Sequence, residues 1–275
     1  MPQSQYKSNK ELKSLARVQI NQRLGLLIGA ILLNAAILFV SVNVVSLLCP
    51  ANTLIGYIIN YILLFVVQIA SCVLNVGISL IFLKSACGMP STISDLFYGF
   101  QHNFTKILQI GTLICIVQAI CMIPFDIASV HLTEIITSNP LFINYNTNSL
   151  TSMTVNNAEF WQAYSIMTNA MMKYYFIMLV CTIISTILTL PFFPAFYMIL
   201  DFPDWSVSTI VKRCFEVMNG NKLRLFIFYM SFIPIYLLSI VTCGLALIWI
   251  IPYCTMATTN FYLDLMAVRN KSLSH

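Results

Sequence analysis

The side chains that could carry chemistry in this 275-residue chain are few and widely spaced. Its three histidines, His102, His131 and His275, belong to three separate predicted parts of the chain. The nine cysteines form no Cys-x-x-Cys pair, so the sequence predicts neither a zinc site nor a disulfide framework. His-Glu-x-x-His, Gly-x-Ser-x-Gly and the phosphate-binding Gly-x-x-x-x-Gly-Lys pattern are absent, which argues against a membrane-embedded protease or a nucleotide hydrolase. We therefore expect no enzyme activity, no metal and no cofactor.

Charged residues also avoid the interior of the apolar runs, where they would mark a proton or ion pathway. Asp201, Asp204 and Asp264 lie near the ends of such runs, which argues against a proton-coupled pump or a channel with a charged filter. The polar residues within the runs are the amides Asn34, Asn60, Gln68, Asn75 and Gln118. Amides in membrane helices commonly form hydrogen bonds between helices, and substrate binding is the alternative.

The composition is that of an all-α membrane protein. Apolar residues make up 59% of the chain, charged residues only 8%, and the mean hydropathy is +0.85. A soluble domain carries about 25% charged residues, so this chain could not cover a surface that faces water. Its net charge of +5 is better explained by basic loops beside a lipid bilayer than by nucleic acid, which we do not expect as a partner.

Six apolar runs are predicted to cross the membrane, since a span needs about 20 apolar residues. They cover 24–48, 54–83, 107–125, 174–200, 225–241 and 245–265, within a single integral membrane domain over 1–275. The first run follows a polar, basic segment and has no small-residue cleavage site after it. We therefore expect a retained helix and not a signal peptide.

The basic residues predict the orientation. Lys and Arg precede the first span, lie between the second and third and between the fourth and fifth, and follow the sixth. With an even number of spans these four segments face one side, which the positive-inside rule makes the cytoplasm. Only Lys173 is predicted on the other side. We expect a bacterial inner-membrane protein with both termini in the cytoplasm.

A short cytoplasmic amphipathic helix is predicted ahead of each odd-numbered span. The first begins with the capping box Ser8-Asn9-Lys10-Glu11, and the segments 93–100 and 207–218 follow the i, i+3, i+4, i+7 spacing of apolar residues. The simplest account is a threefold repeat of amphipathic helix and helix hairpin. Its units would cover approximately 8–83, 91–200 and 205–266. The alternative is chance similarity among basic segments beside membrane helices.

The segment 126–170 is predicted to be an extracytoplasmic loop. It contains three acidic residues, no Lys or Arg, and the polar stretch Asn144–Asn157. A loop of this length is uncommon without a purpose, so we regard it as a candidate surface for a protein partner. Partial disorder is the alternative.

The C-terminal third carries a recognisable series of motifs. These are Thr242-Cys243-Gly244, Trp249-Ile250-Ile251-Pro252-Tyr253 and Asn260-Phe261-Tyr262-Leu263-Asp264-Leu265, preceded by Met218-Asn219-Gly220-Asn221-Lys222. Together, and most specifically over 191–265, they resemble a bacterial multi-pass membrane family known as domain of unknown function 975, common in Gram-positive bacteria. Members usually have a Pro-Gly-Ile-like turn where this chain has Pro191-Phe192-Phe193. The family has no established activity, so the resemblance implies no catalytic residue.

Two functional hypotheses follow. The first is a non-enzymatic accessory, scaffold or immunity-type protein that binds another membrane or secreted protein. The second is a carrier for a lipid or a neutral small molecule, which an internal repeat would favour. An enzyme acting on lipids is less favoured, because no acid–base pair or metal cluster is visible. The candidate recognition surface combines aromatic, amide and basic residues near the predicted interface: Trp249, Pro252, Tyr253, Asn260, Tyr262, Asn219 and Lys222. Interface anchoring and helix packing are the alternative roles.

Overall fold

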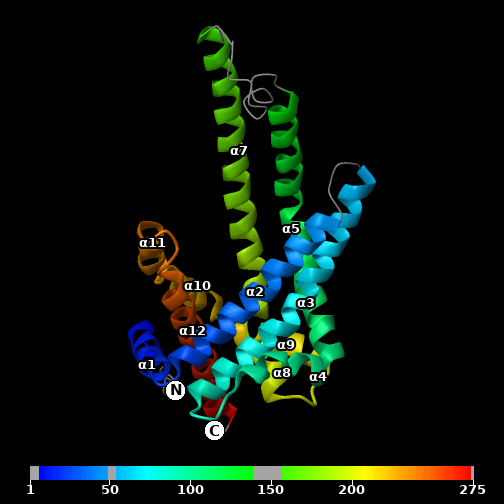
Figure 1. Ribbon diagram of the computed structural model, residues 1–275. Coiled ribbons are helices and arrows are strands. Elements are labelled where there is room, and N and C mark those ends of the chain that lie inside the picture. Colours follow the sequence, from blue (N-terminus) through cyan, green and yellow to red (C-terminus); the bar gives the residue numbers. More distant parts are fainter. Residues whose placement is uncertain (1–5, 49–53, 139–156, 274–275) are drawn as a thin grey trace. The chain divides into compact units, whose positions relative to one another are not determined.

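The protein, seen here in a computed structural model, is largely helical over the residues whose structure is described, which are 6–48, 54–138 and 157–273 (Figure 1). No strand occurs in these ranges, so the predicted all-α class is confirmed. Contacts group the chain into two compact units. The first comprises Met1–Cys115 and Leu190–His275, and the second comprises Ile116–Thr189.

Most of the helices belong to the first unit. In chain order they are α1 (Asn9–Asn21), α2 (Leu24–Leu48), α3 (Leu54–Ala86), the 3-10 helix η1 (Ile93–Phe97), α4 (Tyr98–Gln101), the start of α5 (Phe104–Ser138), η2 (Leu190–Phe192), α8 (Ala195–Asp201), α9 (Val207–Met218), α10 (Lys222–Met230), α11 (Ile233–Val241) and α12 (Leu247–Leu273). The second unit consists of the rest of α5 and α7 (Asn157–Thr189).

Five helical segments among the described residues are long and apolar enough to cross a membrane. They are Leu24–Leu48, Ile58–Ala86, Phe104–Ser138, Trp161–Asp201 and Lys222–Val241. The predicted sixth span, 245–265, falls within α12 except for its first two residues, and α12 is not among them. Its apolar sequence is diluted by Thr255, Thr258, Thr259, Asn260 and Asp264. The predicted count of six and the predicted threefold repeat are therefore not confirmed.

Prolines interrupt the later spans. The helix that begins at Asn157 gives way at Leu190 to the 3-10 turn that contains Pro191, and α8 starts only after Pro194. Likewise, α10 and α11 are separate helices, with Pro234 in the first turn of α11. Proline lacks the amide hydrogen that a continuous helix needs, but it fits a first turn.

Helix extends into the segment that was predicted to be the outer loop. α5 passes through Pro124 and continues to Ser138, and α7 already begins at Asn157. The predicted loop 126–170 is thus helical at both of its ends, where apolar residues such as Ile127 and Ile166 recur among polar ones, and its extracytoplasmic position stays a prediction. Residues 139–156, with nearly all of the polar stretch Asn144–Asn157, lie outside the described residues.

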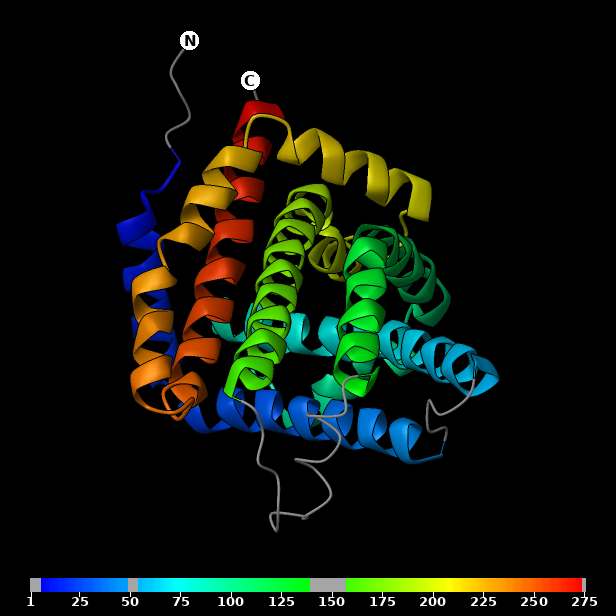
Figure 2. The ribbon, with the colours of Figure 1, turned by 90° about the horizontal axis from the view of Figure 1, so that it is seen from above.

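The predicted capping box begins α1. The Ser8 amide donates to Glu11 Oε2 at 2.7 Å, and the Glu11 amide donates to Ser8 Oγ at 3.3 Å. These bonds lower the pKa of Glu11. Leu12, Ala16 and Ile20 are buried along one side of the helix, which lies beside α12 (Figure 2). Similarly, α9 buries Ile210, Cys214, Val217 and Met218.

The segment predicted as the second amphipathic helix has a different structure. Residues 93–97 form a 3-10 helix and 98–101 a single α-turn, and Ile93, Phe97 and Phe100 of the predicted apolar stripe are exposed. Backbone contact with α3 explains this arrangement. A Cβ atom added to Gly77 would lie 1.9 Å from the Leu96 carbonyl oxygen. The segment thus approaches α3 too closely for any residue but glycine at position 77.

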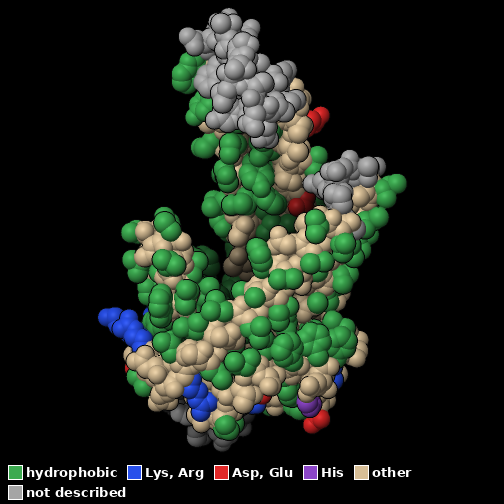
Figure 3. All heavy atoms as spheres, in the orientation of Figure 1, with side chains coloured by type: hydrophobic (Ala, Val, Ile, Leu, Met, Phe, Trp, Pro, Cys, Tyr) green, Lys and Arg blue, Asp and Glu red, His purple; other side chains and the backbone are tan. Residues whose placement is uncertain are grey.

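The second unit buries few side chains. Ala163, Cys181 and Ser185 are buried, and Phe125 of α5 contacts Tyr174 of α7 with ring centroids 5.0 Å apart. Large apolar residues such as Trp161 and Phe176 are exposed, and hydrophobic side chains cover much of the visible surface of α7 (Figure 3). Such a surface is typical of helices that face lipid or another protein.

Candidate functional site

Two places in the described structure gather polar groups: a set of contacts around α12 in the first unit, and a cleft in the second. Around α12, the Tyr262 hydroxyl donates to Asp201 Oδ2 at 2.5 Å, and its ring stacks on Tyr197 with centroids 4.6 Å apart. The Tyr197 hydroxyl in turn lies 3.1 Å from Thr259 Oγ1. Because Tyr197 and Tyr262 are buried, these bonds satisfy groups that water cannot reach.

An amide chain joins three helices. Asn260 of α12 donates from Nδ2 to Gln19 Oε1 at 2.7 Å, and Gln19 of α1 donates from Nε2 to the Ala86 carbonyl at the end of α3 at 3.0 Å. Asn260 is buried. This is the inter-helix role that amides commonly have in membrane bundles.

A buried ion pair connects α10 with α12. Arg224 Nη2 lies 2.6 Å from Asp264 Oδ2, and the two side chains are 19% and 5% exposed. The guanidinium carbon lies 4.4 Å from the ring centroids of both Tyr6 and Phe261. The backbone of Lys7 completes the cluster, because its amide donates to Asp264 Oδ1 at 3.3 Å and its carbonyl accepts from Arg224 at 3.0 Å. Arg224 Nη1 is buried and has no hydrogen-bond partner among the described residues.

A second ion pair fixes the segment after α3. Lys84 Nζ lies 2.8 Å from Asp95 Oδ1, and the Thr92 amide donates to Asp95 Oδ2 at 2.9 Å. Burial opposes ionisation of Asp95, but the hydrogen bonds from Lys84 and Thr92 outweigh it and lower the pKa of the carboxyl group. Arg23 donates to Ser91 Oγ at 3.0 Å and to the Met89 carbonyl.

Two further cations contact neighbouring elements. Lys13 donates to the Ser231 carbonyl at 2.7 Å and lies 4.2 Å from the centroid of the Phe232 ring. Burial lowers the pKa of Lys13. Arg269 lies 3.0 Å from Glu216, and this hydrogen bond lowers the pKa of Glu216.

The four basic segments of the sequence therefore contact one another within the first unit. Lys7 reaches Asp264, Arg23 reaches Ser91, and Lys106 donates to the Pro203 carbonyl. On the face shown in Figure 3, the visible Lys and Arg side chains of this unit lie at the end that carries α1. Several ionisable groups of this unit, such as Arg23, Arg224 and Arg269, are used in contacts between elements.

The thiols and histidines do not assemble a metal centre in the described part of the chain, where no three His, Cys, Asp or Glu side chains come together. The closest thiols are Cys72 of α3 and Cys115 of α5, with 3.8 Å between their sulfurs. Gly111 leaves the room for this approach, since a Cβ there would lie 2.8 Å from Cys72 Cβ.

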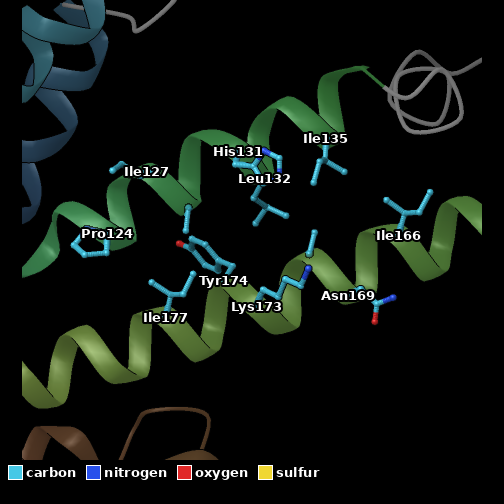
Figure 4. A pocket seen from close by; sticks show the side chains of 12 residues that line it. Pro124, Ile127, His131, Leu132, Ile135, Ile166, Asn169, Lys173, Tyr174 and Ile177 are labelled. Atoms are coloured by element: carbon cyan, nitrogen blue, oxygen red, sulfur yellow. The ribbon is translucent and has the colours of Figure 1, made fainter.

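The second unit contains a cleft of about 470 Å³ between α5 and α7. Its lining is largely apolar and includes Pro124, Ile127 and Ile177. Figure 4 shows Leu132 of α5 and Tyr174 of α7 directed into the space between the helices. Sequence reasoning missed this cleft, because most of the residues on both sides of it were assigned to the predicted loop 126–170.

The polar groups of the cleft are His131, Asn169, Lys173 and the Tyr174 hydroxyl. Lys173 makes no hydrogen bond or ion pair with any residue in the ranges that the structure describes. His131 Nδ1 lies 3.9 Å from Glu134 Oε2, with both side chains exposed. The one signal in the sequence was Lys173 itself, the single basic residue predicted on the outer side.

Comparison with known protein families agrees with the resemblance seen in the motifs. The model of a family described as a protein of unknown function, DUF975, matches residues 1–269. The chain belongs to the DUF975 family. No curated protein and no solved structure matches this DUF975 protein.

The seven residues predicted as a recognition surface are not equally accessible in this DUF975 protein. Trp249 is 57% exposed, and Asn219 and Lys222 are exposed too. Pro252, Asn260 and Tyr262 are buried. Tyr253 is half-buried, with its ring 5.9 Å from Phe232 and 5.8 Å from Arg17. Asn260 and Tyr262 therefore have packing roles in this structure, and recognition by the exposed members stays a prediction.

Proposed function

We propose that this DUF975 protein is a non-enzymatic accessory protein of the bacterial inner membrane, which binds another membrane or secreted protein through the outer ends of α5 and α7. The observation that carries this proposal is the length of the two helices. α5 has 35 residues and α7 has 33, which corresponds to about 50 Å each at 1.5 Å per residue.

A bilayer accommodates only part of that length. Its hydrocarbon core is about 30 Å thick, and about 40–45 Å with the headgroups. A tilt of about 20° shortens the projection of such a helix by only a few ångströms. The helix ends at Ser138 and Asn157 would therefore project beyond the membrane.

The turns near these helix ends carry side chains that are poorly suited to water. Trp161 is 63% exposed, Tyr164 47%, Ile166 48% and Ile136 38%. Outside the hydrocarbon core such a set of exposed apolar residues favours contact with another protein. The first unit supports the absence of catalysis, since its buried charges, such as Arg224 and Asp264, are paired across helices.

The partner surface can be tested by site-specific photo-crosslinking in cells. A photoreactive residue at position 161 should capture one defined protein, whereas the same residue at 176, also exposed but nearer the centre of α7, should capture lipid. The double variant Trp161→Ala/Tyr164→Ala should lose the partner in mild-detergent purification, and Phe176→Ala should keep it. Equal retention of the partner by both variants would contradict the proposal.

The cleft between α5 and α7 favours a second candidate, a carrier for a lipid or a neutral small molecule. A carrier should move its cargo between the leaflets or across the membrane of a proteoliposome, and blocking the cleft should stop this movement. Measuring the transfer of labelled lipid by the wild type and by Ala170→Trp, which would fill the cleft, separates a carrier from a protein-binding factor.

The arrangement of the membrane segments is part of the proposal. With α12 as a sixth span, both termini lie on one side, and the contact of Lys7 with Asp264 supports this. The positive-inside rule then assigns the basic end of the first unit to the cytoplasm. There α1 and α9 would be amphipathic helices under the bundle, with their buried sides toward it.

A further inference from the structure

The cleft between α5 and α7 has the size and lining of a ligand site. Its volume of about 470 Å³ falls within the range of roughly 300–1,000 Å³ that is typical of small-molecule sites. Both of its walls come from the second unit, with Pro124 to Ile135 on α5 and Ile166 to Ile177 on α7. An apolar chain would fit against Pro124, Ile127 and Ile177.

Lys173 gives the cleft a charge that the protein leaves unpaired. Its ammonium group has no partner among the described residues, although α7 is long and apolar enough to cross a membrane. A cation at headgroup depth is attracted to the anionic headgroups of lipids. The other titratable groups that line the cleft are His131 and Tyr174, and its described lining includes no Asp or Glu.

The charged and polar groups lie part-way along the cleft. Pro124, Ile127 and Ile177 lie at one end, Lys173 and His131 lie farther along the same two helices, and Asn169, Ile135 and Ile166 lie toward the other end (Figure 4). Lys173 directly precedes the predicted span 174–200, which places its amino group at headgroup depth. The acyl chain of a lipid bound there would then extend toward Ile177 in the hydrocarbon layer.

We propose that this cleft binds an anionic phospholipid of the outer leaflet, with Lys173 paired to the phosphate and one acyl chain between α5 and α7. Charge complementarity selects this ligand, because an apolar helix or a zwitterionic lipid would leave the ammonium group uncompensated or only partly compensated. The site goes beyond the protein-binding function and does not rest on it.

The test measures which lipid stays bound. The full chain is reconstituted in nanodiscs of phosphatidylcholine and phosphatidylglycerol and extracted in mild detergent, and retained lipid is quantified by mass spectrometry. We expect about tenfold enrichment of phosphatidylglycerol, the lower range for a hydrogen bond to a charged group. Lys173→Gln should abolish the enrichment, and Lys173→Arg should preserve it.

Matched controls separate the cleft from general effects. Lys212→Gln removes an exposed cation on α9, and Ile183→Trp adds a ring to the exposed side of α7; both should retain wild-type enrichment. Ala170→Trp, which would fill the cleft, should lose it. Unchanged thermal unfolding would show that the variants are folded.

Three results would overturn the proposal. The first is equal enrichment by the wild type and Lys173→Gln. The second is displacement of the lipid by glycerol phosphate alone, which would show a site for a free anion. The third is a disulfide-linked dimer of Leu132→Cys that forms in place of lipid binding, which would show that a second copy occupies the cleft. Loss of the protein partner in Trp161→Ala/Tyr164→Ala leaves this measurement unaffected, so the two proposals fail separately.

Discussion

The ion pair between Arg224 and Asp264 offers the sharpest test of how the first unit is held together. Replacing Asp264 by Asn keeps the shape of the side chain but leaves Arg224, only 19% exposed, without its counter-charge. Removing one partner of a buried pair costs about 3–5 kcal/mol. The guanidinium keeps its contacts with Tyr6, Phe261 and the Lys7 carbonyl, so we expect a smaller loss of about 2–3 kcal/mol.

The loss should be visible in thermal unfolding of the purified protein in detergent. For a chain of this size, each kcal/mol shifts Tm by about 2–4 °C, which gives an expected decrease of roughly 5–10 °C. A thiol-reactive dye provides the readout, because Cys214 is fully buried and burial raises its pKa to about 12. Cys214 therefore reacts only when the unit opens.

A double-mutant cycle decides whether the pair itself is responsible. Asp264→Asn, Arg224→Gln and the double variant should show a coupling of about 1–2 kcal/mol. Glu216→Gln, which removes a more exposed partner of Arg213 and Arg269, should shift Tm much less. Strictly additive effects, or no change in Tm for Asp264→Asn, would refute the view that this pair stabilises the contact between α10, α12 and the N-terminal segment.

Three further predictions concern topology, acid stability and close packing. A membrane-impermeant thiol reagent should label the exposed Cys243 in intact cells and the exposed Cys87 only after permeabilisation; the reverse pattern would invert the proposed orientation. Because the pKa of Asp95 is lowered from its ordinary value of 3.8, its contribution to stability is present above that value and lost as pH falls through the folded pKa. The Tm of Asp95→Asn should therefore lie below that of the wild type at pH 6 and converge with it in strong acid. Gly77→Ala should destabilise the protein by about 1–3 kcal/mol through overpacking, measured as a lower Tm, whereas Gly25→Ala, with nothing within 4 Å, should not.

The hydropathy pattern predicted the first two spans closely. The expected ranges 24–48 and 54–83 correspond to α2, with the same bounds, and to α3, which ends three residues later. In both cases the apolar sequence ends at the end of the helix or within three residues of it. The capping box at Ser8 was predictable as well, because it depends only on residues three apart.

Features that depend on tertiary contacts could not be predicted. Helix α5 continues past Pro124 to Ser138. The residues between Pro124 and Ser138 mix apolar and polar types and include no strong helix breaker, so hydropathy does not mark where the helix ends. The 3-10 structure at Ile93–Phe97 depends on how closely it lies on Gly77 of α3. Asn260 could be identified from the sequence as an amide group near an interface, and Tyr262 as an aromatic group there. Their burial depends on Gln19 and Asp201, whose positions only the fold provides.

The docking of α1 on α12 has a consequence for biogenesis. Leu12, Ala16 and Ile20 of α1 are buried in the unit that includes α12, and the Lys7 amide donates to Asp264 of α12. The docking of α1, which is synthesised early, therefore depends on α12, which is synthesised late. Until α12 is made and packed, the apolar side of α1 lacks the docking surface that α12 provides. We therefore expect closure of the first unit to require α12, and a chain truncated before α12 to expose the apolar side of α1 to proteases.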